Sequence, residues 1–278
     1  MVNITAADVN KLRQMTGAGM MDCKKALQEN EGDFEKAIDY LRKKGQKLAT
    51  KRADKDANEG IVLARTNEAK DYAVVFMLNC ETDFVAKNQE FVDFSNLLMS
   101  KAIENMPSTV EEFKALNVNG RNVEENITEM IGKTGEKMEL AHFEVIRAPR
   151  VFAYNHPGNR LATILGLNKT GTDGIDQAGH EVAMQIAAMA PVAVDKDDVP
   201  AETIAREIEI GKEQARQEGK PEEMVEKIAL GKLNKFYKES TLLNQEFVRD
   251  NKLSVGEYLR KLDKDLTVTG FKRFMLGA

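Results

Sequence analysis

The sequence predicts a multi-domain α+β protein, and three features of its 278 residues indicate this fold class. Residues 1–55 carry apolar side chains at helical spacing. Further along, pairs of β-rich runs joined by polar turns occur twice, and each pair is followed by a helical pattern. With 42% hydrophobic and 31% charged residues, the chain can bury a core and is long enough for more than one domain.

Residues 1–55 predict three short helices that share one small core. The first is expected to begin with Thr5 and Asp8, which form the pattern of a capping box. The third is expected to begin at the cap residue Asp33 and to end at Gly45. The apolar faces consist of Val9, Leu12 and Met15 in the first helix and Phe34, Ala37, Ile38 and Leu41 in the third.

Met20 and Met21 follow a glycine-rich turn at residues 17–19. Methionines after such a turn are most often fillers of gaps in a core. Adjacent residues at the start of a helix point in different directions, so at least one of the two is expected to face outward. This loop and the later Gly32–Asp33 pair resemble a three-helix bundle of the ubiquitin-associated type.

A basic cluster begins at the predicted end of the third helix and continues into a polar stretch that ends at Gly60. Its members are Arg42, Lys43, Lys44, Lys47, Lys51, Arg52 and Lys55. The pattern favours a solvated helix end, where cations complement the helix dipole, followed by a linker. Contact with RNA is the alternative interpretation.

Two segments with the same order, hairpin and then helix, indicate two related α+β subdomains. In the first, β-rich runs within residues 60–78 precede a helix at about 88–103. In the second, β-rich runs within residues 151–167 precede a helix at 176–190. Sequence identity between the two copies is slight, and the motif is a common one.

Residues 200–238 predict two antiparallel helices of high charge density. Gly219 ends the first helix, and Pro221 stands at the start of the second. Ile208 and Ile228 belong to the apolar stripes of the two helices. Such a hairpin either packs on its own subdomain or projects and pairs with a second copy of the chain.

These patterns together predict four regions. They are a three-helix bundle at 1–55, a first α+β subdomain at 56–140, a second α+β subdomain at 141–190 with 239–278, and a helical hairpin inserted at 191–238.

Composition excludes several classes of protein. Cys23 and Cys80 are too few for a disulfide framework and lie in apolar settings, which is typical of buried free thiols in a reducing cytosol. The chain has no apolar run of membrane-spanning length and no secretion signal at its start. A net charge of -5 argues against a binder of phosphate backbones, because such binding depends on clustered cations. A protein partner is favoured, without a role for nucleic acid or membrane.

No motif indicates catalysis. His142, His156 and His180 are far apart and belong to no metal or nucleophile motif, so a structural role is expected for each. The glycine-rich segments at 17–19 and 171–174 lack the Gly-Lys-Ser/Thr end of a P-loop. We therefore expect no bound nucleotide, cofactor or metal.

The most informative segment is residues 78–87. It follows an apolar, strand-like run and has Phe84 at the corner where capping residues open a helix. A ring at such a corner either tucks back into its own core or anchors the chain in a partner's pocket, with Asp83 fixing its direction.

Residues 12–27, with a Gly-Ala-Gly-Met-Met motif, and residues 78–87, with a Thr-Asp-Phe-Val motif, together resemble the paired signatures of bacterial elongation factor Ts. Weaker similarity at Val268–Phe271 extends the resemblance over nearly the whole chain. In that family the motif phenylalanine, here Phe84, enters a pocket in the GTPase domain of elongation factor Tu. The aspartate before it, here Asp83, helps to disturb the region that holds the phosphates and magnesium.

The resemblance assigns further contacts with the same GTPase domain to Arg13, Met20 and Met21. Thr82 and Val85 complete the Thr-Asp-Phe-Val motif and are counted with the partner-binding residues, although Val85 is also suited to seat the motif on its own subdomain. For Arg13 the competing interpretation is an exposed helix cation without a partner.

The resemblance thus implies a cytoplasmic translation elongation factor that promotes GDP release from elongation factor Tu and catalyses no covalent chemistry. It also implies self-pairing through the 200–238 hairpin. A second interpretation is that the N-terminal bundle docks other polypeptides while the remainder is a scaffold, and an enzyme is the third.

Overall fold

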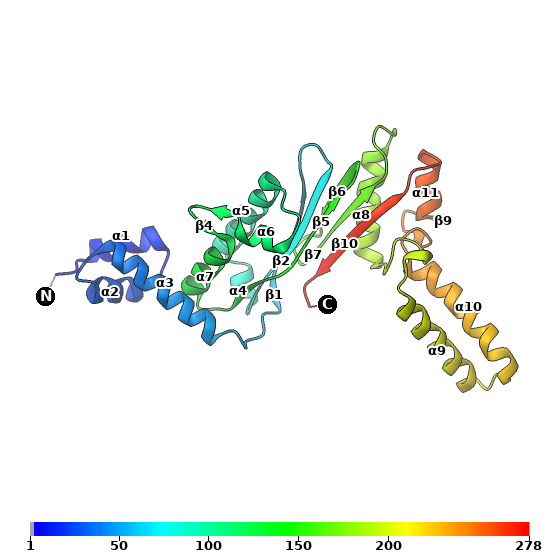
Figure 1. Ribbon diagram of the computed structural model, residues 1–278, viewed down its shortest axis with the longest axis horizontal. Coiled ribbons are helices and arrows are strands. Elements are labelled where there is room, and N and C mark those ends of the chain that lie inside the picture. The colour runs from blue at the N-terminus through cyan, green and yellow to red at the C-terminus, as the bar shows by residue number, and fades with distance from the viewer. Residues whose placement is uncertain (1–2, 278) are drawn as a thin grey trace. The chain divides into compact units, whose positions relative to one another are not determined.

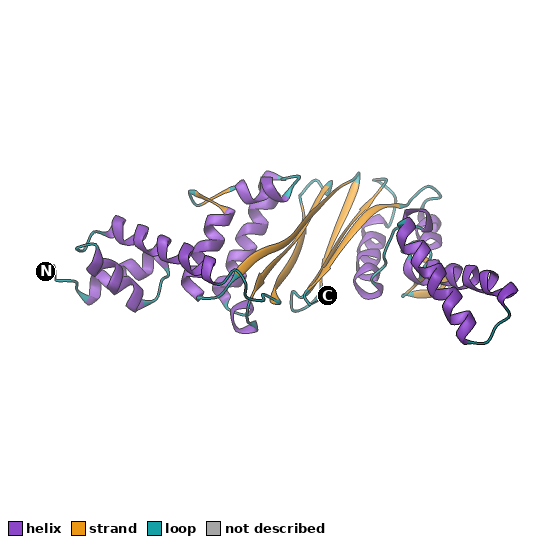
Figure 2. Cartoon of the chain, turned by 60° about the horizontal axis from the view of Figure 1, so that its bottom comes forward, coloured by secondary structure: helices purple, strands orange, loops and turns teal. Residues whose placement is uncertain are grey.

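The computed structural model describes residues 3–277 and confirms the α+β class, since helices and β-sheets both occur along the chain (Figure 1, Figure 2). The chain divides into two compact units. The first contains the described residues up to Leu63, Phe76–Glu144 and the described residues from Met275 onward. The second contains Ala64–Val75 and Val145–Phe274.

The first unit begins with three helices, α1 (Ala6–Thr16), α2 (Met20–Glu29) and α3 (Phe34–Lys51). The predicted capping box is present, because the Thr5 side chain accepts from the Asp8 amide and the Asp8 side chain accepts from the Thr5 amide. Asp33 caps α3 as predicted. The small shared core consists of Val9, Leu12, Ala18, Cys23, Ala26, Leu27 and Ala37.

The prediction that Gly45 ends the third helix is wrong, because α3 continues to Lys51. Gly45 lies where α3 packs on α7 (Val123–Thr134), opposite Gly132. A Cβ atom on Gly45 would stand 3.2 Å from the Thr128 carbonyl oxygen. The glycine therefore permits close helix packing and is not a stop signal. It follows that Lys47 and Lys51 of the basic cluster are exposed helical residues and not part of a linker.

Three strands form the sheet that follows, in the order β1-β2-β5. The strands are β1 (Glu59–Thr66), β2 (Tyr72–Cys80) and β5 (Met138–Arg147). Between β2 and β5 run α4 (Asp83–Ala86), α5 (Gln89–Asn105), α6 (Val110–Ala115), the short pair β3 (Asn117–Val118) and β4 (Arg121–Asn122), and α7. Stacked rings join α6 to the sheet, because Phe113 lies 5.7 Å from Phe76 and 4.7 Å from Phe143 between ring centroids.

The second unit contains a sheet of order β10-β7-β6. Its strands are β6 (Arg150–Asn155), β7 (Leu161–Leu167) and β10 (Val268–Met275). Helix α8 (Ile175–Met189) packs on β6 and β7, and Gly179 makes this approach possible because a Cβ atom there would lie 2.2 Å from the Phe152 ring. The core also includes α11 (Val255–Leu262), which follows the pair β8 (Glu246–Phe247) and β9 (Asp250–Ser254).

A 3-10 turn at Lys196–Asp198 leads into two long helices, α9 (Ala201–Gln217) and α10 (Glu222–Ser240), which form a hairpin (Figure 1). Gly211 allows the two helices to approach closely, because a Cβ atom there would lie 3.1 Å from the Ala229 Cα. Ile208 and Ile228 are partly buried. The exposed large apolar side chains of the hairpin are Ile210, Met224 and Leu230.

Candidate partner-binding site

Helix α4 is a single turn that follows directly on strand β2 and carries Phe84. Thr82 is its N-cap, with the side-chain oxygen 3.4 Å from the Val85 amide. The Phe84 side chain is 83% exposed, the highest value among the large hydrophobic residues of the described chain. Its ring therefore does not tuck back into the core, and an exposed ring of this size on a capped turn is available to a partner.

Asp83 forms an ion pair with Lys87 one turn later, with 2.6 Å between the carboxylate oxygen and the ammonium nitrogen. The hydrogen bond and the charge of Lys87 lower the pKa of Asp83, so its carboxylate is ionised at neutral pH. Val85 is partly buried, which fits the role of seating the turn.

A polar network holds the start of α4. The Thr82 amide and hydroxyl both donate to the Glu136 carboxylate, at 3.0 and 2.7 Å. The neighbouring Glu81 carboxylate accepts from the Lys137 amide at 2.6 Å and from the Arg52 guanidinium at 2.7 Å. Burial favours the neutral form of Glu81, but the Lys137 amide and Arg52 outweigh burial and leave the pKa of Glu81 below its ordinary value.

The Cys80 thiol and the backbone of α4 complete the bonding of Thr82. The thiol lies 3.3 Å from the Thr82 carbonyl oxygen, which also accepts from the Ala86 amide at 3.1 Å. Burial, with the nearby charges of Glu136 and Glu59, raises the pKa of Cys80 to about 12, so the sulfur keeps its proton and can donate. Cys23 and Cys80 are both buried free thiols, as the sequence predicts.

The bundle presents a second group of exposed side chains around the turn at residues 17–19. Met20 is 53% exposed and Met21 is 75% exposed, so both face solvent and not only one of them. Arg13, near the end of α1, is also exposed. Met15 was expected in the core, yet it is 56% exposed. The sequence pattern did not identify Met15 as a surface residue. Its place in the last turn of the helix, just before the glycine-rich turn, was the available signal.

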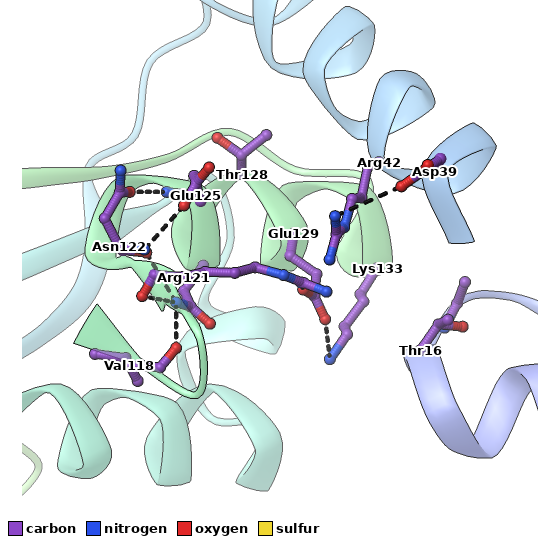
Figure 3. A network of polar contacts seen from close by, with 12 residues as sticks. Thr16, Asp39, Arg42, Val118, Arg121, Asn122, Glu125, Thr128, Glu129 and Lys133 are labelled. Carbon is purple, nitrogen blue, oxygen red and sulfur yellow. Dashed lines mark hydrogen bonds and ion pairs between the residues drawn. The ribbon is translucent and has the colours of Figure 1, made fainter. Parts of the chain in front are cut away.

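Lys133 of α7 lies close to Gly17 of this turn. Figure 3 shows that the Lys133 ammonium is directed to Glu129. A Cβ atom on Gly17 would be 2.8 Å from the Lys133 Cε, and the backbone there is left-handed with φ of 67°, so glycine suits the position for two reasons. The Lys133 ammonium lies 3.2 Å from Glu90 at the start of α5 and 3.4 Å from Glu129. Arg121 also pairs with Glu129. The stem of Lys133 thus lies near the turn before Met20, while its ammonium pairs with the helix that follows α4.

Two of the histidines, which are far apart in the sequence, come together around Tyr154. Within residues 3–277 no group of three or more histidine, cysteine or acidic side chains is placed to hold a metal ion. The His156 ring nitrogen lies 2.9 Å from the Tyr154 hydroxyl, and the His180 ring packs edge-on against the Tyr154 ring. No helix in the described part of the chain is long and apolar enough to cross a membrane.

Comparison with known proteins gives a consistent result. Residues 81–278 match the sequence model of the family described as Elongation factor TS. The chain is 51% identical over 275 residues to Elongation factor Ts of Amoebophilus asiaticus, covering 99% of both chains. It is 52% identical over 278 residues to Elongation factor Ts of Cytophaga hutchinsonii, covering both chains fully. The protein of the same name from Porphyromonas gingivalis is 48% identical over 276 residues, with 99% of both chains covered.

Proposed function

The chain belongs to the elongation factor Ts family, and on this premise we propose that it inserts Phe84, with Asp83, into the GTPase domain of elongation factor Tu. Family membership makes it a nucleotide-exchange factor of translation. The insertion promotes release of GDP, so that GTP can bind. The single observation that carries the proposal is the 83% exposure of the Phe84 ring on a turn whose first residue is fully hydrogen-bonded.

Exchange of this kind requires no covalent step by the factor. A protein that binds the nucleotide-free GTPase more tightly than the nucleotide-bound form lowers nucleotide affinity by the same ratio. Moving the GTPase from mostly closed to mostly open requires a difference of about 10⁴-fold, or about 5.5 kcal/mol. One fully buried phenylalanine contributes only about 1.5–3 kcal/mol. The mechanism therefore requires contacts in addition to Phe84.

The bundle supplies these additional contacts in our proposal. Met20 and Met21 are exposed at the start of α2, and the exposed Arg13 lies near the end of α1. Methionine side chains adapt well to the surface of a partner, and arginine is enriched at interface hot spots. We assign Thr82 and Val85 to the same contact region as Phe84, because they are part of one capped turn.

The finer architecture is part of the same proposal. Residues 1–55 are a bundle of the ubiquitin-associated type, and residues 56–140 form the first hairpin-plus-helix subdomain. Residues 141–190 with 239–278 form a related second subdomain, and residues 191–238 are an inserted helical hairpin. The shared element order, in which α5 follows β1 and β2 and α8 follows β6 and β7, supports the relation between the two subdomains.

Self-pairing through the 200–238 hairpin is supported by its exposed apolar side chains. Ile210, Met224 and Leu230 are 42%, 46% and 48% exposed. A second copy of the hairpin would bury side chains of this kind. We further propose that the protein acts in the cytoplasm, where translation takes place, and that it contacts neither the nucleotide nor nucleic acid.

Release of a fluorescent GDP analogue from purified elongation factor Tu tests the function. Release is followed with increasing concentrations of this protein and with excess unlabelled GDP as the trap. We expect the release rate to rise with concentration and to reach a plateau. A release rate that stays at its spontaneous value over the whole titration would refute the proposed function.

A further inference from the structure

Two short segments of the first unit exchange hydrogen bonds between carboxylates and backbone amides. The Glu136 carboxylate accepts from the Thr82 amide, while the Glu81 carboxylate accepts from the Lys137 amide. The two segments lie 54 residues apart in the sequence. Hydrogen bonds to an ionised acceptor are roughly twice as strong as bonds between neutral groups, so this reciprocal arrangement holds the segments in one register.

The Glu136 carboxylate uses both of its oxygens on a single residue. Its Oε2 accepts from the Thr82 amide at 3.0 Å, and its Oε1 accepts from the Thr82 hydroxyl at 2.7 Å. Because the two oxygens belong to one planar carboxylate, accepting both bonds restrains the backbone and the side-chain rotamer of Thr82 together. The same hydroxyl oxygen faces the Val85 amide at 3.4 Å and thereby caps α4.

Helix α4 cannot fix its own direction. It has only four residues, far fewer than an isolated helix needs to be stable in water. Val85 and Ala86 are partly buried and seat the turn, but the Phe84 ring is 83% exposed, so packing against the core does not hold the ring itself. The hydrogen bonds that tie the start of this turn to a distant segment of the first unit are made at its N-cap, Thr82.

We propose that Glu136 is a positioning residue, which acts through Thr82 to hold Phe84 in the orientation that enters the partner. This inference rests on the proposed function, in which Phe84 contacts the GTPase. Glu136 does not itself need to touch the partner. When the bound orientation is populated only in part, the apparent affinity falls by that fraction, whereas the rate at saturation does not change.

The variants follow from the geometry. Glu136→Ala removes both acceptors, whereas Glu136→Gln keeps one oxygen that can accept from Thr82. Glu139→Ala is the matched control, because it removes the same negative charge three residues away. The Glu139 carboxylate pairs with Lys137 at 3.1 Å, whereas Thr82 is bound by the Glu136 carboxylate. Thermal unfolding of each variant shows which of them are folded.

The first measurement is the concentration dependence of stimulated GDP release. We expect Glu136→Ala to raise the half-saturating concentration about 10-fold, with a maximal rate within about 2-fold of the wild type. The half-saturating concentration of Glu136→Gln should lie between those of the wild type and Glu136→Ala. Glu139→Ala should match the wild type. In a Phe84→Ala background, Glu136→Ala should raise the half-saturating concentration by less than about 2-fold further, because the side chain that Glu136 positions is already gone. Additive losses in this double-mutant cycle would overturn the inference.

The second measurement does not use the partner. Amide hydrogen exchange of the isolated protein should become at least about 10-fold faster at residues 82–86 in Glu136→Ala, while the amides of β2 remain protected. Unchanged exchange at residues 82–86 in a folded Glu136→Ala protein would also overturn the inference. If the wild type stimulates no GDP release, the proposed function fails by itself, and the hydrogen-exchange result alone then decides whether Glu136 holds the turn.

Discussion

Replacement of Phe84 by alanine separates a loss of binding from a loss of folding. The side chain is 83% exposed, so about a sixth of its surface is buried in the folded chain. Full burial of a phenylalanine contributes about 1.5–3 kcal/mol, and the loss of a sixth of that costs at most about 0.5 kcal/mol of the free energy of unfolding. For a chain of this size, such a change lowers the melting temperature by about 1–2 °C.

The same arithmetic gives the expected loss of function. If the partner buries the exposed part of the ring, the variant loses about 1.2–2.5 kcal/mol of interaction. Because about 1.36 kcal/mol corresponds to a factor of ten, stimulated GDP release should become about 8- to 70-fold slower at subsaturating concentrations. The assay is the release of fluorescent GDP from elongation factor Tu, read beside a thermal melt of the same preparation.

Phe91→Ala is the control for a core residue. Phe91 is fully buried in α5, only seven positions after Phe84, and such a substitution costs about 3–5 kcal/mol of stability. Phe91→Ala should therefore lower the melting temperature strongly and reduce exchange only in proportion to the unfolded fraction. A large drop in the melting temperature of Phe84→Ala, with normal exchange per folded molecule, would refute the interpretation of Phe84 as an anchor.

The other predictions concern the bundle, a helix crossing and pH. Replacing Met20 and Met21 by serine should weaken binding to elongation factor Tu at least about 5-fold in a titration, with an unchanged melting temperature, since both side chains are exposed; equal affinity would assign this surface to another partner. Gly45→Ala should lower the free energy of unfolding by about 1–3 kcal/mol through overpacking, whereas Gly231→Ala, in a helix with open space around it, should be neutral or stabilising in the same denaturant titration. The pKa of Glu81 is lower in the folded state than its ordinary value of 4.5, so its stabilising contribution is present above that pH and is lost as the pH falls through the folded pKa. Glu81→Gln should accordingly show a smaller loss of stability than the wild type between neutral pH and acid, and identical pH profiles would contradict the assignment.

Features that depend on neighbouring residues could be predicted from the sequence, whereas features that depend on distant residues could not. The caps at Thr5 and Asp33 depend on bonds that span three residues, so the sequence pattern contains both partners. Gly45 has the same appearance in sequence as a helix-ending glycine. Its actual role depends on Gly132 of another helix, which no local window includes. The error at Gly45 also explains why Lys47 and Lys51 were expected in a linker.

The candidate site shows the same division. Phe84 stood out because an aromatic residue at the start of a capped helix is unusual. The sequence left open whether the ring is buried or presented, and the structure shows that it is exposed. Glu136 gave no signal, because glutamate is common on protein surfaces and its partner Thr82 is 54 residues away. A carboxylate that binds a backbone amide can do so next to almost any sequence, so only the three-dimensional arrangement identifies it.

The helical hairpin shows why amphipathic spacing alone does not identify a pairing surface. The spacing marks Ile208 and Ile228 as part of the apolar stripes, but the close approach at Gly211 and Ala229 makes the two helices bury much of these stripes against each other. Apolar side chains that are buried between the two helices of one hairpin cannot also pack against a second copy. The side chains that remain for self-pairing are the exposed Ile210, Met224 and Leu230, which lie outside the tight contact. A lysine at Ile208 or Ile228 would therefore disrupt the hairpin itself, and a test of pairing must use the exposed positions.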